Sequence, residues 1–240
     1  MSGIKLAGNT AIVTGGSRGI GRGIALTLAA AGADIAFCHY GDDERAKATV
    51  ADIEALGRKS YAAECDVSSP IVVKKFYADA VSAIGDIDIL VNNAGHNITE
   101  PFEDISEESF DRMLDVHVKG TFFMTQSAYR DMKRRGKGRI INITSQLAYK
   151  GAPKMAHYCA AKGANTTFTR ALALECGDTG VLVNAVAPGV THTDLLTPLA
   201  DEVLDTLKAS IPLNRFAEVD EIAPAVALLA STEGSFFHGS

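Results

Sequence analysis

Short apolar runs alternate along the chain with longer segments in which apolar residues recur every three or four positions. The apolar runs have the composition of β-strands and cover residues 11–13, 35–37, 87–91, 140–143 and 181–186. The longer segments have helical periodicity and cover residues 20–31, 44–56, 71–84, 109–134, 158–176 and 219–229. Several of them open with Asp or Ser in an N-cap position. This alternation predicts parallel strands joined by right-handed crossovers.

We therefore expect an α/β fold, a doubly wound parallel sheet of the Rossmann type with helices on both faces. The 240 residues fit one domain, since no Gly/Ser linker, repeat or low-complexity tract marks a second. Residues 191–212 are the exception to the regular alternation. In doubly wound sheets ligands bind beyond the carboxyl ends of the strands, so candidate chemistry is sought directly after each apolar run.

Composition and charge exclude several classes of partner. Hydrophobic residues make up 47% of the chain and charged residues 22%, as in globular proteins, and the formal net charge is -6. Such a field attracts neither nucleic acid nor an anionic membrane surface, and neither a signal peptide nor an apolar run long enough for a membrane span occurs. Four cysteines are scattered without metal-ligand spacing: Cys38, Cys65, Cys159 and Cys176. We expect a reducing, cytoplasmic location and no metal site.

A glycine-rich turn with the spacing GxxxGxG follows the first apolar run. Its residues are Gly15, Gly16, Ser17, Arg18, Gly19, Ile20 and Gly21. Glycine lets the backbone turn tightly beside a pyrophosphate, and the N-terminus of the next helix directs unpaired N–H groups at the anion. The position after the first strand favours a dinucleotide site; a plain glycine-rich turn is the alternative.

Further polar and small residues follow the later runs in a fixed order. They are Asn92, Asn93, Ala94 and Gly95, then Ser145, then Tyr158 with Lys162 one helical turn on, and finally Pro188 and Gly189. Together with the glycine-rich turn, this ordered set resembles the short-chain dehydrogenase/reductase family from about residue 9 to the end of the chain. The resemblance implies a nicotinamide-dependent oxidoreductase.

The chemistry of carbonyl reduction explains three of these residue types. An acid must protonate the carbonyl oxygen as hydride arrives, and Tyr158 is the candidate. Bringing its pKa from about 10 to near 7 requires roughly 4 kcal/mol of preferential phenolate stabilisation. Lys162 lies on the same helical face and, with an oxidised nicotinamide ring, can supply that field. Ser145 would hold the substrate oxygen by a hydrogen bond.

The family resemblance also implies the remaining cofactor contacts. Lys162 would bind the nicotinamide ribose, Asn93, Ala94 and Gly95 would flank the cofactor, and Asp66 with Val67 would contact the adenine. The segment that contains Pro188, Gly189, Thr191 and Thr193 would lie beside the nicotinamide carboxamide. Read from the residues alone, Asp66 is equally plausible as a helix cap near Ser68.

The sequence departs from the common family pattern at one catalytic position. An asparagine on the fourth helix normally holds a water that links the active-site lysine to solvent, and here His117 stands in its place. Imidazole can both donate and accept hydrogen bonds, so a retained proton relay through His117 is the favoured interpretation. A merely tolerated substitution is the alternative.

The end of the second strand decides between NAD and NADP. An acid there binds the adenosine 2′-hydroxyl and repels a 2′-phosphate, but this sequence has His39 at the expected place. Arg18 could pair with the phosphate, while Asp42 and Asp43 look more like caps for the next helix. We therefore predict NADP(H) as the cofactor.

Residues 191–212 resemble the mobile substrate lid of the family, and a surface helix packed through its leucines is the alternative. The apolar residues of this segment include Leu195, Leu196, Pro198, Leu199 and Leu204. Candidate substrate contacts are His96, Gln146, Ala148, His157 and His192, a mostly polar set.

Among family members the sequence looks most similar to 3-oxoacyl-[acyl-carrier-protein] reductases, which implies a small carbonyl or alcohol substrate and an acyl-carrier protein as a possible partner. Five basic residues could dock that acidic carrier or form a solvated helix end: Lys133, Arg134, Arg135, Lys137 and Arg139. Leu174 stands where many such reductases have a basic residue. A sugar or polyol dehydrogenase of the same family is the alternative, and a catalytically silent dinucleotide sensor is the alternative from another class.

Family members continue past the point where this sequence stops, into a last strand and a short tail. We therefore expect the sheet to lack that strand. By the same resemblance we expect a homo-oligomer, a tetramer.

Overall fold

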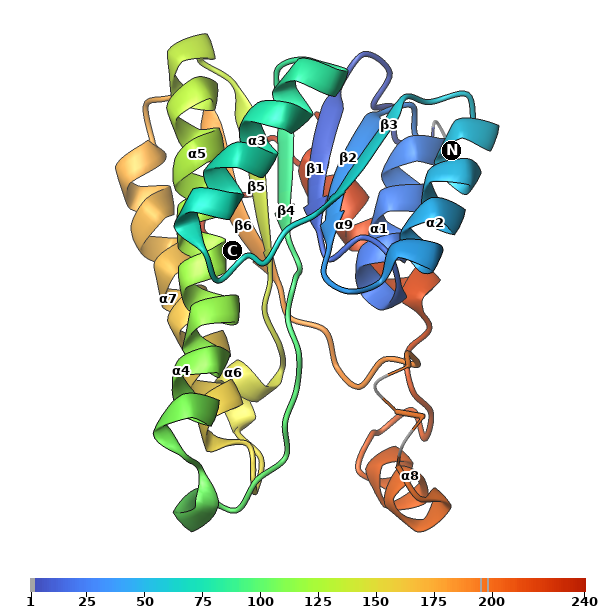
Figure 1. Cartoon of the computed structure of the whole chain (residues 1–240), viewed down its shortest axis with the longest axis vertical. Helices are drawn as coiled ribbons and strands as arrows, with labels where there is room; N and C mark the ends of the chain where they lie inside the picture. Colours follow the sequence, from blue (N-terminus) through green and yellow to red (C-terminus); the bar gives the residue numbers. More distant parts are fainter. Residues whose placement is uncertain (1–2, 195, 198) are drawn as a thin grey trace.

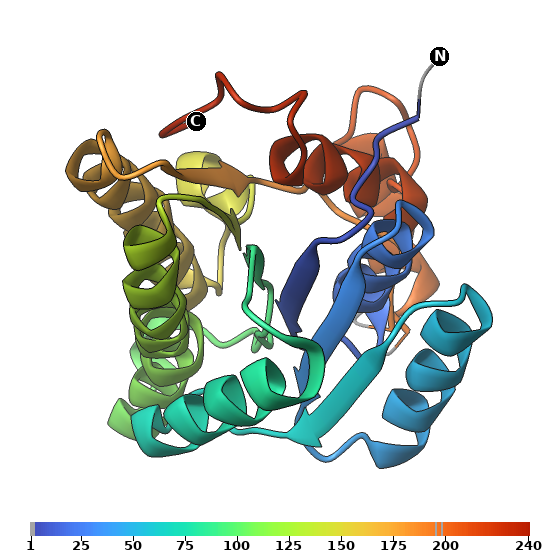
Figure 2. The same cartoon turned by 90° about the horizontal axis from the view of Figure 1, so that it is seen from above.

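The computed structural model describes residues 3–194, 196–197 and 199–240, and within them the predicted doubly wound sheet is confirmed. Six parallel strands lie in the order β3-β2-β1-β4-β5-β6 (Figures 1 and 2). Their bounds are β1 Thr10–Thr14, β2 Asp34–His39, β3 Ser60–Glu64, β4 Ile89–Asn92, β5 Gly138–Ile143 and β6 Val181–Val186. The strand order reverses between β1 and β4, which is where such a sheet binds its ligand.

Helices cover both faces of the sheet, as Figure 2 shows from above. The described helices are α1 Gly19–Ala30, α2 Asp43–Ala55, α3 Pro70–Ile84, α4 Glu107–Leu114, α5 Gly120–Arg135, α6 Leu147–Lys150, α7 Ala156–Cys176, α8 Asp201–Ala209 and α9 Val219–Ala230. A short 3-10 turn, Phe102–Asp104, precedes α4. One core cluster lies between the sheet and α1 with α9, and the other lies between the sheet and α3, α5 and α7.

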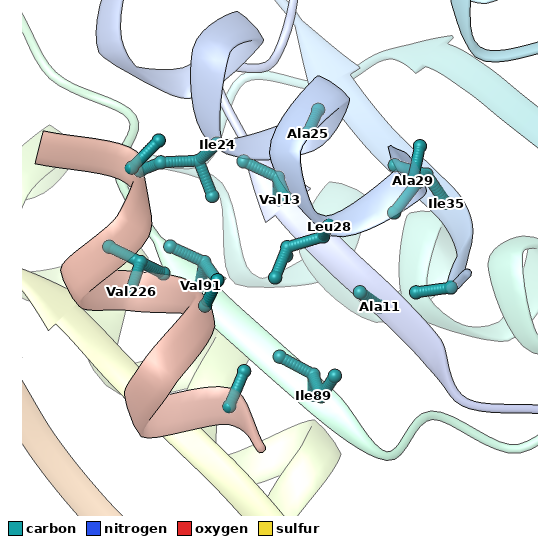
Figure 3. Close-up of a cluster of buried hydrophobic side chains, with 14 of the residues drawn as sticks. Ala11, Val13, Ile24, Ala25, Leu28, Ala29, Ile35, Ile89, Val91 and Val226 are labelled. Carbon is teal, nitrogen blue, oxygen red and sulfur yellow. The ribbon is translucent and has the colours of Figure 1, made fainter. Parts of the chain in front are cut away.

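Strand alternation divides the core between the two faces. Val13 and Val91 face α1 and α9, where they pack with Leu28 and Val226 (Figure 3), whereas Ile12 belongs to the cluster on the opposite face. Because both faces are covered, the strands are nearly continuous runs of buried residues. This two-sided burial is the reason that the central strands are readable from sequence as apolar runs.

The structure adds one strand that the sequence pattern missed. β3 reads Ser60-Tyr61-Ala62-Ala63-Glu64 and pairs with β2 at the edge of the sheet. Its residues are half-buried or exposed, so they lack the apolar run that marks the central strands. An edge strand whose side chains are only partly buried carries little hydrophobic signal.

The predicted helix over residues 109–134 begins at Glu107 and contains an internal irregularity. Residues Asp115–Lys119 form a π-helical turn between α4 and α5. Single π-turns of this kind occur mostly within longer helices, often at functional sites. His117 is the middle residue of the turn Asp115–Lys119.

The segment 191–212 contains α8, which lies at the same end of the molecule as α6 (Figure 1). Leu195 and Pro198 lie outside the described residues. At the end of the chain, Gly239 N donates to Val183 O at 2.8 Å and Ala185 N donates to Ser240 O at 2.8 Å. The final residues therefore run along the outer edge of β6, although the sheet of the described residues contains six strands.

Candidate active site

The glycine-rich turn lies where β1 ends, directly beside the turn that follows β4. Gly15 has φ +68°, and a Cβ there would lie 3.0 Å from the Cα of Ala94, so both the conformation and the space require glycine. Gly19, with φ +53°, begins α1, whose first turn has no acidic residue. The free N–H groups at this helix N-terminus fit a pyrophosphate.

Hydrogen bonds tie the two strand ends together at the switch point. Thr14 Oγ1 accepts from the backbone N–H groups of Asn93 and Ala94, both at 2.9 Å. Asn93 Nδ2 donates in return to Thr14 O at 3.0 Å. The predicted Asn93, Ala94 and Gly15 are therefore brought together on one rim of the crevice.

Ser145, Tyr158 and Lys162 converge beyond β5. Ser145 follows the strand and accepts from Leu147 N at 3.1 Å, while the other two lie on one face of α7. Lys162 is buried, and its Nζ donates to Ile143 O at 2.9 Å, within the strand that leads to Ser145. The same Nζ lies 5.7 Å from the centroid of the Tyr158 ring.

The electrostatics of Tyr158 differ from the sequence expectation. Burial raises the pKa of Tyr158 above its ordinary value, and the hydrogen bond with Ser145 only partly opposes this. Burial also lowers the pKa of Lys162 to about 8. The protein alone therefore keeps the phenol protonated, and phenolate stabilisation requires a further positive charge at the site.

His117 lies within reach of both Tyr158 and the turn after β4. The imidazole is buried, its ring is edge-on to that of Tyr158, and its Nε2 lies 2.8 Å from His96 O. Its own carbonyl accepts from Asn165 Nδ2 at 2.9 Å. Burial and the nearby charge of Lys162 lower the pKa of His117 well below the usual value, so the imidazole is neutral at pH 7.

The imidazole of His117 lies directly against Gly95. A Cβ on Gly95 would lie 2.8 Å from Nδ1 of His117 and closer still to Cε1. The ring therefore occupies the space above Gly95, and the pair is sterically matched. Within the described part of the chain, Nδ1 of His117 has no hydrogen-bond partner.

Of the residues around this histidine, His96 and His157 were expected from sequence as substrate contacts, whereas Glu100 was not anticipated. Glu100 lies 3.5 Å from Nε2 of the buried His157 and accepts from Ser109, while the rings of His96 and His117 lie 5.5 Å apart. Glu100 comes from an irregular loop, which carries no periodicity that would have identified it. Three histidines thus gather beside Tyr158.

Beside the glycine-rich turn, His39 is buried at the end of β2 and Asp42 occupies the N-cap position of α2. Asp42 does not cap the helix with its side chain within the described residues, contrary to expectation; it accepts from Ser17 Oγ at 2.8 Å. Its carboxylate also lies 3.7 Å from Arg18 Nε. Ser17 and Arg18 of the glycine-rich turn therefore meet at the Asp42 carboxylate, while His39 lies 3.7 Å from Asp43.

Asp66 and Val67 follow β3. Asp66 accepts from Ser68 N at 3.0 Å and from Arg112 Nη1 at 3.0 Å, whereas Ser69 is the N-cap of α3. Burial raises the pKa of Asp66, but the hydrogen bonds from Ser68 and the charge of Arg112 outweigh it, so the pKa lies below the ordinary value. Arg112, which also lies over the ring of Tyr40, was not anticipated from sequence.

The segment after β6 runs across the crevice. Pro188 O accepts from Gln146 N at 3.0 Å, Thr191 forms an isolated bridge with Ala217, and Thr193 packs against Gly19. Residues of this segment and of the stretch after α8 line a cavity of about 600 Å³, with Leu204, Arg215 and Phe216 among them. The segment that contains Pro188, Gly189, Thr191 and Thr193 thus runs from Gln146, next to Ser145, to the glycine-rich turn.

The candidate basic patch lies at the other end of the sheet. Arg135 and Lys137 pair with Asp88, immediately before β4, at 2.7 and 3.0 Å, and Arg134 pairs with Asp131 at 3.0 Å. Lys137 precedes β5, whereas Ser145 follows it, so a strand length of roughly 20 Å separates the two ends. The patch does not adjoin the candidate catalytic residues.

Within the described ranges, no helix is long and apolar enough to cross a membrane, and no group of three or more histidine, cysteine or acidic residues could hold a metal ion.

Comparisons with known proteins cover nearly the whole chain. The short chain dehydrogenase family model matches residues 9–203. The chain is similar to the 3-oxoacyl-[acyl-carrier-protein] reductase FabG of Staphylococcus epidermidis, with 39% identity over 230 residues, 96% of this chain and 94% of the relative. It is also similar to the structure of a dehydrogenase/reductase from Sinorhizobium meliloti 1021, with a TM-score of 0.93, 37% identity, and coverage of 98% and 93% of the two chains. A short chain dehydrogenase from Burkholderia cenocepacia J2315 in complex with NADP has a TM-score of 0.91, 36% identity, and coverage of 98% and 95%.

Proposed function

The chain belongs to the short-chain dehydrogenase family and is an NAD(P)-dependent oxidoreductase; from this premise we propose that it interconverts a ketone and a secondary alcohol with Tyr158 as general acid and base. The observation that carries the proposal is the convergence of Ser145, Tyr158 and Lys162 beyond β5, beside the glycine-rich turn. No such convergence is needed for a dinucleotide sensor, which is why catalysis is favoured over sensing.

In the proposed reaction, Ser145 donates a hydrogen bond to the substrate oxygen and Tyr158 transfers its proton to that oxygen. When bound, the nicotinamide supplies or takes the hydride, and its oxidised ring is positively charged. Lys162 has a pKa of about 8 and is mostly protonated at neutral pH, so its charge favours the phenolate. Burial raises the pKa of Tyr158, so the residue is held as an acid until these charges act on it.

We assign His117 to the route by which Tyr158 regains its proton. Its imidazole is neutral, it lies beside Tyr158, and its buried Nδ1 can accept a hydrogen bond. The Nζ of Lys162 uses one of its three protons to donate to Ile143 O. Another proton is therefore available for a hydrogen-bonded chain towards His117. His117 therefore takes the place of the asparagine expected at this position.

We propose NADP(H) as the cofactor, held by the predicted residues Gly15, Ser17, Arg18, Gly19, Ile20 and Gly21 at its phosphates. Arg18 is half-exposed at the adenosine end, and the last residue of β2 is His39 in place of an acid. Asp43 Oδ1 lies 3.7 Å from Nδ1 of His39 at this end. Asp42 is a second acid here, and Arg18 and Arg45 lie 3.7 and 4.0 Å from its carboxylate. Its charge is thereby compensated. The relative bound to NADP supports the same choice.

For the substrate we propose a 3-oxoacyl thioester, as the name of the Staphylococcus relative suggests. An acyl-carrier protein that delivers it would have to dock near α6 and the lid, because the basic patch at Arg135 lies at the opposite end of the sheet. A sugar or polyol is the second candidate, favoured by the polar side chains of His96 and Gln146 near the site. We further propose a homotetramer, for which the half-exposed Phe122, in contact with Phe168, offers an apolar face.

The test is turnover measured at the absorbance band of the reduced cofactor. A 3-oxoacyl thioester and simple ketones are offered with NADPH or NADH, and polyols and sugars with the oxidised cofactors. We expect the thioester with NADPH to react fastest and Tyr158→Phe to abolish turnover while cofactor binding is kept. Tight cofactor binding without turnover of any substrate–cofactor pair would establish a sensor. Full activity of Tyr158→Phe would refute the acid–base assignment.

A further inference from the structure

An ionic cluster joins three separate segments at the adenosine end of the cofactor site. Arg45 Nη1, on α2, donates to Asp194 Oδ2 of the lid at 2.6 Å. Arg18 Nη1 of the glycine-rich turn lies 4.0 Å from the same oxygen. Asp42 lies 3.7 Å from Arg18 Nε and 4.0 Å from Arg45 Nε. Two guanidinium groups and two carboxylates thus meet, and the formal charge of the cluster is zero.

The backbone before Asp194 fixes where the lid begins. Ala217 N donates to Val190 O at 3.0 Å, and His192 N donates to Ala217 O at 2.8 Å. Thr193 then passes over the glycine-rich turn, where a Cβ on Gly19 would lie 3.5 Å from its Cγ2. Asp194 is therefore delivered to the adenosine end by a fixed segment, and it reaches an arginine 149 positions earlier in the sequence.

We propose that Arg45 joins Arg18 in binding the 2′-phosphate of an adenine nucleotide, and that Asp194 is the anion which this phosphate displaces. The inference rests on the proposed use of NADP(H). Once Asp194 has left, Arg18, Arg45 and Asp42 carry a net charge of +1, which suits a phosphate monoester of charge near −2 at pH 7. Two guanidinium groups offer the planar donor pairs that phosphate oxygens accept.

The 2′-phosphate can displace Asp194 because the existing ion pairs are weak. The side chains of Arg18, Arg45 and Asp194 are 55%, 52% and 51% exposed, so solvent screens their mutual attraction. A dianion that contacts both arginines can therefore replace the single carboxylate. The consequence is a coupling: a 2′-phosphorylated nucleotide frees the first charged residue of the lid, whereas a nucleotide without that phosphate leaves the Asp194–Arg45 pair in place.

The binding test compares 2′,5′-ADP with 5′-ADP by calorimetric titration, so it needs neither substrate nor turnover. Asp194→Asn should bind 2′,5′-ADP about two- to fivefold more tightly than the wild type, the size expected for an exposed pair, with 5′-ADP unchanged. Arg45→Gln should lower the affinity for 2′,5′-ADP by a similar factor. In the Arg45→Gln background, Asp194→Asn should change this affinity less than it does in the wild type. Asp205→Asn is the matched control, since Asp205 lies on α8 of the same lid and pairs with Lys208.

The lid is followed separately by hydrogen exchange. Addition of 2′,5′-ADP should speed amide exchange in peptides that span residues 193–199, 5′-ADP should not, and Asp194→Asn should show the faster exchange without ligand. If 2′,5′-ADP binds more tightly than 5′-ADP but Asp194→Asn changes neither affinity nor exchange, the displacement is refuted while the NADP(H) preference stands. Equal binding of the two nucleotides to the wild type would instead overturn the NADP(H) preference itself.

Discussion

The imidazole of His117 lies edge-on to the phenol ring of Tyr158, with ring centroids 5.4 Å apart and an interplanar angle of 87°. The π-helical turn Asp115–Lys119 carries the imidazole, and α7 carries the phenol. Because burial keeps His117 neutral, it can serve Tyr158 and Lys162 as an acceptor without adding a competing positive charge. The contact therefore combines a steric role with the proposed role in proton transfer, and the two can be separated by substitution.

Replacement of His117 by asparagine should keep turnover within severalfold of the wild type, because an amide can also accept and donate hydrogen bonds. His117→Leu should lower kcat roughly tenfold to a hundredfold, within the range of lost proton-transfer catalysis, with little change in cofactor affinity. Steady-state kinetics over pH, with solvent isotope effects, measures both variants. Equal pH profiles and equal kcat for His117→Leu and the wild type would remove His117 from the proton route.

Gly95→Ala should introduce a steric clash with the imidazole of His117. Overpacking of this kind costs about 1–3 kcal/mol, which corresponds to a fall in Tm of roughly 3–10 °C for a chain of this size. The smaller side chain in Gly95→Ala/His117→Ser should restore most of the lost stability. Thermal unfolding of the three variants checks this, and a double variant as unstable as Gly95→Ala would show that His117 is not the obstacle.

Lys162 should make the stability of the protein depend on alkaline pH. Burial lowers its pKa to about 8 from 10.5, so between pH 8 and 10.5 the unfolded chain binds more protons at this residue than the folded chain does. The stability contribution of this group therefore rises with pH through that window and is lost as the pH falls through 8. Lys162→Met should be more stable than the wild type at pH 7, by about 1–3 kcal/mol once the orphaned Ile143 carbonyl is counted.

The difference in unfolding free energy between Lys162→Met and the wild type cancels the other titrating groups. It should shrink steadily as the pH rises from 8 towards 10.5, as measured by denaturant unfolding at several pH values. The variant should be inactive throughout. A pH-independent difference would mean that Lys162 keeps an ordinary pKa in the folded protein.

Arg112 should act on cofactor affinity through Asp66, to which it donates at 3.0 Å. Arg112→Met removes that partner and leaves Asp66 held by Ser68 alone, so the carboxylate should be less well ordered. We expect the dissociation constants of NADPH and NADH to rise by a similar factor, about three- to tenfold, the range of an ordinary net hydrogen bond, with kcat nearly unchanged. Arg134→Met, which removes the exposed pair with Asp131, is the control and should leave both constants unaltered. An effect confined to NADPH would place Arg112 at the 2′-phosphate instead.

The sequence by itself determined the central architecture and the order of the candidate catalytic residues. Strands buried on both faces must be almost wholly apolar, so β1, β2, β4, β5 and β6 were readable as runs, and the residues after them fell at the ligand edge of the sheet. The edge strand β3 was missed because half-buried positions put little constraint on side-chain type. Local spacing also fixed Tyr158 and Lys162 on one face of α7.

Only the tertiary structure decided which distant side chains meet. The clash that makes Gly95 obligatory depends on a π-turn more than 20 residues later, and the Arg45–Asp194 pair depends on the path of the lid across the glycine-rich turn. The side chain of Asp42 accepts a hydrogen bond from Ser17 instead of capping its own helix, because α2 begins close to the glycine-rich turn. Local propensity acts within one or two helical turns, whereas these contacts are set by packing between elements. Burial that results from this packing then shifts the pKa values of His117, Tyr158 and Lys162.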